Sequence, residues 1–160
     1  MAVSLFAWTA LDGIPTATNY GVFSTVNNSP FLSFASGTTI SMAFMGVIPQ
    51  GATLSTNGIK VRIVWASATA TSGNCNWGAQ YERFGTLTVA SDHYGSQVTQ
   101  ASTTSGTVEL TTETDISIPY ANMSSSVAGD PFRLLIQRVT GGSDTMAGAS
   151  QLFTVTIETP

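Results

Sequence analysis

Apolar and polar residues alternate with a period of two along most of this chain, and the period of an amphipathic helix is missing. The segment Gly58–Trp65 shows the alternation most clearly, because its two faces differ completely. One face carries Ile59, Val61, Ile63 and Trp65, and the other carries Lys60 and Arg62. Successive side chains of a β-strand point to opposite faces, so this segment is predicted to be a half-buried antiparallel strand.

Further segments repeat the alternation and are separated by turn residues such as Asn57-Gly58 and Gly141-Gly142. The clear ones are Thr38–Val47, Asn74–Phe84, Val108–Ile118, Pro131–Val139 and Phe153–Ile157, and the weaker ones are Val3–Trp8, Thr18–Phe23 and Phe84–Ser91. About eight short strands without helices are typical of a sandwich or a barrel.

The lengths of the connections favour one of these architectures. The connection Ala66–Gly73 has the length of a hairpin, whereas those over Val89–Thr107 and Tyr120–Gly129 are long. Long crossings between sheets are what a jelly roll needs. The prediction is therefore an all-β protein, an eight-stranded antiparallel jelly-roll sandwich, formed by residues 1–160 as a single domain. Within it, the polar stretch Val98–Gly106 is interpreted as a surface loop.

The charge content excludes several functions. Only 9% of the 160 residues are charged, against about 25% in a typical domain, and 19 Ser and 24 Thr take their place. One Lys and four Arg with a net charge of −4 cannot form the basic stripe that nucleic acids require. A single His and a single Cys exclude a structural zinc site and an intrachain disulfide. The N-terminus lacks a signal peptide and the longest apolar stretch, Met42–Ile48, is too short to span a bilayer, so we expect neither nucleic acid nor membrane as partner.

Candidate catalytic groups are few, and each has a simpler interpretation. His93 lies in a polar loop without a nucleophile and an orienting acid that could form a triad with it. Cys75 shares the apolar face of its segment with Trp77, which is typical of a small buried residue. Glu109, Glu113 and Asp115 share one face of a strand, as a solvated outer face would. We therefore expect no enzymatic activity, no metal and no cofactor.

Aromatic side chains allow a different kind of site. Trp65 and Trp77 fall on the apolar faces of their strands and are expected in the core. Trp8 and Tyr94 have no such periodicity, so they are the candidate aromatics for stacking on a glycan or for an interface.

The segment Lys60–Gly78 has a distinctive pattern of its own. A strand ending in Val64-Trp65 is followed by an Ala/Ser/Thr turn, then by Ser72-Gly73-Asn74, then by a strand carrying Trp77. This segment resembles a pattern found in small virion proteins of tailed bacteriophages. The segments Met42–Pro49, Phe132–Arg138 and Asp144–Leu152 are similar to other parts of the same pattern, so the resemblance covers roughly residues 40–158.

The resemblance implies a jelly-roll protein of the capsid decoration (cement) type, typically a homotrimer that binds the major capsid protein. It implies a location on the capsid surface of the virion after synthesis in the host cytoplasm. The alternative is a tail-fibre or receptor-binding jelly-roll module that recognises host glycans, although such modules usually follow an attachment segment in a longer chain. Residues 1–37 lie outside the match, and are expected to form an N-terminal arm plus the first strands, with the arm as the capsid or trimer contact.

Overall fold

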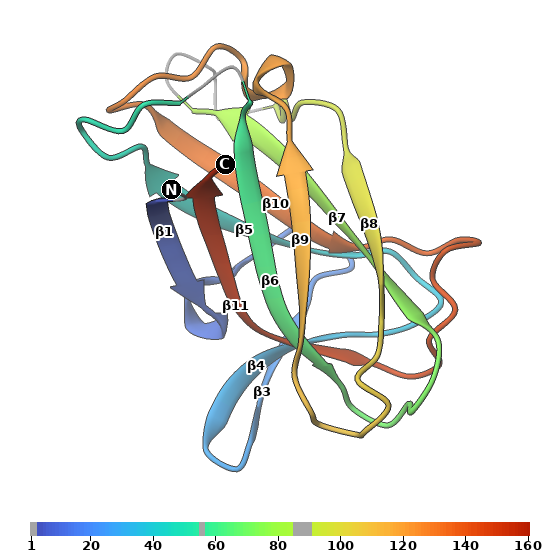
Figure 1. The fold of residues 1–160 in the computed structure, drawn as a ribbon. Helices are drawn as coiled ribbons and strands as arrows, with labels where there is room; N and C mark the ends of the chain where they lie inside the picture. The colour runs from blue at the N-terminus through green and yellow to red at the C-terminus, as the bar shows by residue number, and fades with distance from the viewer. Residues whose placement is uncertain (1–2, 55–56, 85–90) are drawn as a thin grey trace.

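Two antiparallel β-sheets pack face to face in the computed structural model, which describes residues 3–54, 57–84 and 91–160 (Figure 1). The described strands are β1 (Val3–Thr9), β2 (Ile14–Pro15), β3 (Val22–Val26), β4 (Ser29–Phe34), β5 (Ile40–Val47), β6 (Ile59–Ser67), β7 (Asn74–Arg83), β8 (Val98–Thr103), β9 (Thr112–Ile118), β10 (Pro131–Arg138) and β11 (Ser150–Thr159). Two short 3₁₀ helices, η1 (Ala10–Asp12) and η2 (Tyr120–Met123), complete the described elements. The all-β sandwich prediction is confirmed.

The order of the strands is that of a jelly roll. One sheet has the order β3-β4-β11-β6-β9, with β1 also paired to β11, and the other has the order β2-β5-β10-β7-β8. From β4 to β11 the chain changes sheet at every connection except the one between β7 and β8. These eight strands form the two four-stranded sheets of the predicted fold. The Ala66–Gly73 connection is not a hairpin, because β6 and β7 lie in different sheets.

The three remaining strands come from the N-terminal segment, so the described residues contain eleven strands rather than eight. β1 and β4 share one side of β11: β4 pairs with Ser150–Leu152 and β1 pairs with the second half, from Thr154 to Thr159. β2 lies on the outer edge of β5, and β3 extends the other sheet beyond β4. The first strands expected within residues 1–37 are therefore present, and this segment contributes to both sheets.

Several predicted boundaries were wrong for identifiable reasons. The stretch interpreted as a loop at Val98–Gly106 contains β8, an edge strand whose polar side chains face solvent while its backbone pairs with β7. The strand predicted at Thr18–Phe23 begins only at Val22. Its hairpin with β4 turns at Asn27 and Asn28, which both have positive φ, as a two-residue type I′ turn requires. The predicted strand at Phe84–Ser91 falls on residues 85–90, outside the described ranges.

The core lies between the sheets and is rich in aromatic rings. Trp65 of one sheet and Trp77 of the other meet edge to face with their ring centroids 5.9 Å apart, and Phe34 packs on Trp77 at 5.2 Å. Both tryptophans and Cys75 are fully buried, which confirms their predicted inward orientation. The Trp65 indole N–H donates to the Thr114 hydroxyl at 2.8 Å, so burial leaves this polar group paired.

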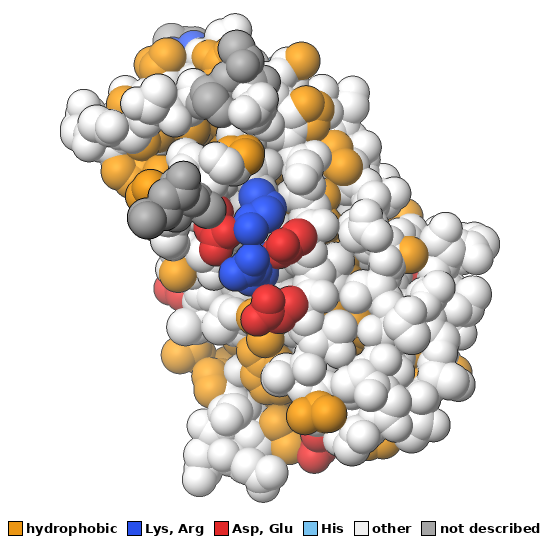
Figure 2. Space-filling model, in the orientation of Figure 1, with side chains coloured by type: hydrophobic (Ala, Val, Ile, Leu, Met, Phe, Trp, Pro, Cys, Tyr) orange, Lys and Arg blue, Asp and Glu red, His pale blue; other side chains and the backbone are white. Residues whose placement is uncertain are grey.

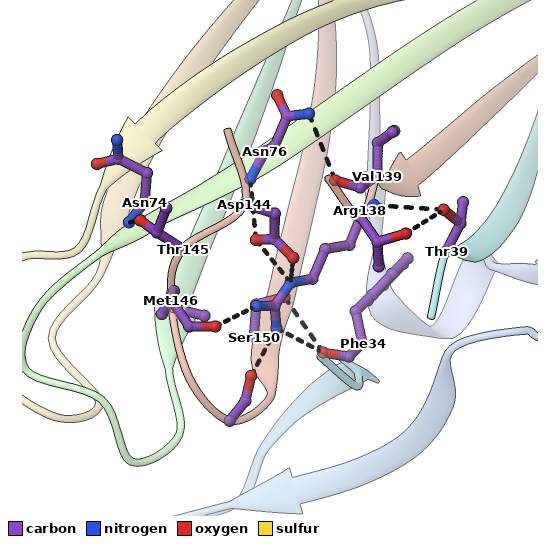
Figure 3. A network of polar contacts seen from close by, with 12 residues as sticks. Phe34, Thr39, Asn74, Asn76, Arg138, Val139, Asp144, Thr145, Met146 and Ser150 are labelled. Atoms are coloured by element: carbon purple, nitrogen blue, oxygen red, sulfur yellow. Dashed lines mark hydrogen bonds and ion pairs between the residues drawn. The ribbon is translucent and has the colours of Figure 1, made fainter. Parts of the chain in front are cut away.

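A charged residue continues the inward face of β10. Phe132, Leu134 and Ile136 point into the core, and Arg138, two residues further, is fully buried with them. Its guanidinium group is bound by the Asp144 carboxylate at 3.1 Å. It also donates to the carbonyl oxygens of Met146 and Gly148, both at 2.6 Å, and of Phe34 at 3.3 Å (Figure 3). Arg138 thus ties the β10–β11 connection to the end of β4.

Replacing Arg138 should strongly destabilise the fold. Arg138→Met leaves the Asp144 carboxylate buried without a counter-charge, and breaking a buried pair in this way costs about 3–5 kcal/mol. The matched control is Arg62→Met on the outer face of the other sheet, where an exposed ion pair contributes at most about 1 kcal/mol. Urea unfolding of the two variants measures the difference, and equal losses would contradict the role assigned to Arg138.

Candidate functional site

A groove of about 550 Å³ lies on the outer face of the sheet that contains β5 and β10. Ala43 and Met45 of β5 and Leu135 of β10 form its apolar floor. One wall is the extended segment that begins with β2, residues 14–18, and the other wall holds Asp92 and Tyr94. The groove therefore combines an apolar floor with one wall of mixed apolar and Thr side chains and one polar wall, and it includes one of the two candidate aromatics.

Buried Glu82 positions the wall that carries Tyr94. Glu82 lies on β7, and its carboxylate accepts hydrogen bonds from the Arg133 Nε at 2.9 Å and from the backbone N–H of His93 at 2.9 Å. Arg133 in turn donates to the Asp92 carboxylate at 2.9 Å. The backbone N–H of Gly95 donates to the carbonyl oxygen of Tyr81 at 2.8 Å. Residues 92–95 are therefore fixed against the sheet by β7 and β10.

Arg133 also contacts the aromatic rings at this end of the groove. Its guanidinium carbon lies 5.3 Å from the centroid of the Tyr94 ring and 5.2 Å from that of Phe84. Burial raises the pKa of Tyr94 to about 12, so the phenol is a neutral hydrogen-bonding group at physiological pH. Within the described residues its hydroxyl has no hydrogen-bond partner. Tyr94 is half-buried and lies beside a cation that is fixed by Glu82 and Asp92.

The other candidate aromatic, Trp8, is a core residue. Its ring is 5% exposed and packs on Phe6, Phe44 and Phe132. Its indole N–H donates to the carbonyl oxygen of Met45 at 3.0 Å, which links β1 to the opposite sheet. The structure does not bring Trp8 and Tyr94 together at one site, and the Trp8 ring has no face free for a ligand. Phe44 and Phe132, which cover the Trp8 side chain, come from other strands, and the sequence alone does not show that they are its neighbours.

The candidate catalytic residues of the sequence do not form a common site in the structure. His93 is exposed, and its Nε2 lies 2.9 Å from the Ser91 hydroxyl. Cys75 is buried beneath the sheet, and this burial raises the pKa of its thiol to about 12. In the part of the chain that the structure describes, no three His, Cys, Asp or Glu side chains form a cluster that could hold a metal ion. In the same ranges no helix is long and apolar enough to cross a membrane.

Only part of the expected acidic face is present, and its carboxylates form ion pairs with basic side chains. Glu113 and Asp115 lie on the outer face of β9 next to Lys60 and Arg62 of β6 and Glu158 of β11, and form the cluster of opposite charges near the middle of Figure 2. The hydrogen bond from Arg62 lowers the pKa of the Asp115 carboxyl. Glu109 is not part of this face, because it precedes the strand in a turn with a φ of 61°.

A second surface is apolar and belongs to the N-terminal segment. Leu11 is 67% exposed, Val22 60%, Phe23 51% and Tyr20 48%. These four residues line a single depression of about 380 Å³, and we refer to them as the N-terminal apolar surface. Val22 and Phe23 lie on β3, the edge strand of a hairpin that projects from the body of the sandwich (Figure 1). The outer edge of β3 has no strand partner among the described residues, so it is free for a contact.

Comparison with known proteins finds no matching protein family and no matching curated protein sequence. Among solved structures the chain is similar to part of an arabinose-bound α-L-arabinofuranosidase, MgGH51, with a TM-score of 0.43 and 14% sequence identity. That likeness covers 98% of this chain and 22% of the enzyme chain.

The buried thiol should be chemically inert. Because its pKa is about 12, Cys75 stays protonated at pH 8, and only the thiolate reacts with iodoacetamide. Native protein should remain unlabelled at pH 8, and the same protein in concentrated urea should be labelled completely. Rapid labelling of the native state would show that the thiolate is present and accessible, contrary to its burial.

Removing the Glu82 carboxylate should release the groove wall. In Glu82→Ala the His93 amide loses its acceptor and Arg133 loses its buried partner, and breaking a buried pair costs about 3–5 kcal/mol. Amide hydrogen exchange at His93 should become faster, and the free energy of unfolding should fall. Glu113→Ala, on the exposed face of the other sheet, is the control and should change neither quantity appreciably.

Proposed function

We propose that this chain is a non-enzymatic structural protein of a tailed-phage virion, a capsid decoration (cement) protein that stabilises the head shell by binding the major capsid protein. The observation that carries the proposal is the N-terminal apolar surface, with Leu11, Val22 and Phe23 more than half exposed. Contiguous exposed apolar side chains of this size are typical of interaction sites. The sequence resemblance to small virion proteins gives this contact its proposed partner.

The charge distribution supports an attachment of this kind. Each Lys and Arg of the chain is bound by a carboxylate of the same chain. The surface is therefore poor in unpaired positive charge, and its contacts depend on neutral side chains. Burial of neutral apolar area is little affected by ionic strength, whereas contacts between exposed charges are screened by salt. A shell protein held by many such contacts stays attached over a wide range of salt concentrations.

The same surface suits assembly of the protein with itself into the homotrimer that the resemblance implies. The β3–β4 hairpin projects beyond the sandwich and ends in a free edge (Figure 1). In a closed ring of three copies, one hairpin reaches the next copy, and its exposed edge is covered. On this proposal the N-terminal segment is the capsid or trimer contact.

The alternative function is that of a tail-fibre or receptor-binding module that recognises host glycans. The observation in its favour is the groove beside Tyr94, whose apolar floor and few polar groups resemble those of small-molecule sites in general. The two functions differ in copy number. A decoration protein is present in hundreds of copies on the head, and a receptor-binding module in few copies on the tail.

Purified virions therefore decide between them. Quantitative mass spectrometry and antibody labelling should find the protein in hundreds of copies, located on the head. A small number of copies confined to the tail would rule out decoration and leave the receptor-binding alternative.

The apolar surface can be tested by substitution. In Val22→Ser with Phe23→Ser, binding to heads that lack the protein should weaken by at least about tenfold for each side chain, because burying one contributes about 1.5–3 kcal/mol. The control is Val127→Ser with Leu110→Ser, two side chains that are equally exposed elsewhere. Equal occupancy of heads by both double variants would contradict the assignment of this surface.

A further inference from the structure

We infer that the groove between residues 14–18 and Tyr94 is a binding site for an uncharged saccharide. This inference goes beyond the decoration function and does not depend on it, because the groove and the depression at the N-terminal apolar surface share Pro15 alone among their lining residues. The groove has a volume of about 550 Å³, which lies within the range of about 300–1,000 Å³ common for ligand pockets.

The floor of the groove suits the apolar face of a sugar ring. Ala43 and Leu135 are paired across β5 and β10 and are nearly buried, and Met45, two residues beyond Ala43, is 41% exposed, so the floor consists of aliphatic and thioether side chains. The Tyr94 ring stands beside this floor and is held from behind by Arg133. Aromatic side chains bind apolar surfaces over a large area at a small cost in conformational entropy, since they have few rotatable bonds.

Polar groups on the rim match sugar hydroxyls, which both donate and accept hydrogen bonds. The Ser41 hydroxyl oxygen already accepts from the Gln137 amide at 2.9 Å, so its O–H is left to donate. The Tyr94 hydroxyl has no partner within the described residues. The Asp92 side chain is 69% exposed and uses one carboxylate oxygen for Arg133, which leaves the other oxygen to accept from a ligand.

The charges around the groove select against acidic ligands. Arg133 is the basic residue of the lining, and its guanidinium group is occupied by Glu82 and Asp92. One cation and two carboxylates give this end of the groove a formal charge of −1. A phosphate or a sialic acid would therefore meet a negative field and no free cation. An uncharged hexose or N-acetylhexosamine has no such penalty, and its hydroxyls fit the acceptor and donors on the rim.

The test uses the purified full chain and a glycan array that carries neutral hexose and N-acetylhexosamine oligosaccharides beside their sialylated and phosphorylated forms. We expect binding to members of the neutral set only, followed by titration calorimetry with the strongest of them. Binding only to acidic glycans, or to none of the neutral ones, would overturn the inference.

Two variants locate the site. Tyr94→Ala should weaken binding of the selected glycan by about tenfold, the loss expected from one aromatic contact of about 1.4 kcal/mol. Ala17→Trp, at an exposed position of the opposite wall, should fill the groove and abolish binding even if Tyr94→Ala fails to fold. Unchanged affinity in a folded Ala17→Trp protein would place the glycan elsewhere and overturn the inference.

A matched tyrosine separates this site from the proposed function. Tyr20 lies on the N-terminal apolar surface and outside the groove, so Tyr20→Ala should weaken binding to heads and leave glycan affinity unchanged. Tyr94→Ala should do the reverse. Loss of glycan binding in Tyr20→Ala and not in Tyr94→Ala would place the saccharide on the N-terminal apolar surface. This result would refute the groove as the saccharide site, whatever the result with heads.

Discussion

The pairing of every basic side chain with a carboxylate of the same chain is the constraint on which much of this structure depends. Five Lys and Arg and nine Asp and Glu are few for 160 residues, and each of the five cations forms an ion pair within the chain. Apart from these charges, the surface consists of uncharged polar and apolar side chains. Contacts of such a surface depend on shape and on burial of neutral area, which is the physical basis of both binding surfaces proposed above.

Two of these pairs hold together segments that are far apart in the sequence. Arg138 with Asp144 closes the end of the sandwich, because it binds backbone carbonyls of the β10–β11 connection and of β4 at once. Arg133 with Glu82 does the equivalent on the outer face, where it fixes Asp92 and Tyr94 over β10. A buried or half-buried cation that is fully hydrogen-bonded holds several segments in one arrangement, since each lost partner would leave a charge unpaired.

The N-terminal segment separates the two surfaces and belongs to both. Residues 14–18 run along the edge of β5 and form one wall of the groove, while Leu11, Tyr20, Val22 and Phe23 surround the apolar depression on the other side. Pro15 lines both. A protein bound through its apolar surface would thus hold the groove in a defined position next to the contact, on a wall shared by the two sites.

The period-two pattern by itself determined which side chains of each strand point into the core: Trp65, Trp77 and Cys75 lie where the alternation puts them. It also placed Glu82 on the outer face of β7, and only the tertiary structure shows that residues 92–95 cover it and make it the anchor of the groove. The same holds for Arg138, which the alternation puts inside although its charge argues against it, and for Trp8, buried by β5 and β10. Alternation is a local property of the backbone, whereas pairing partners, sheet membership and the coverage of an outer face depend on segments far apart in the sequence. The strand faces could therefore be predicted, and the groove, with its paired charges and the half-buried Tyr94 beside them, could not.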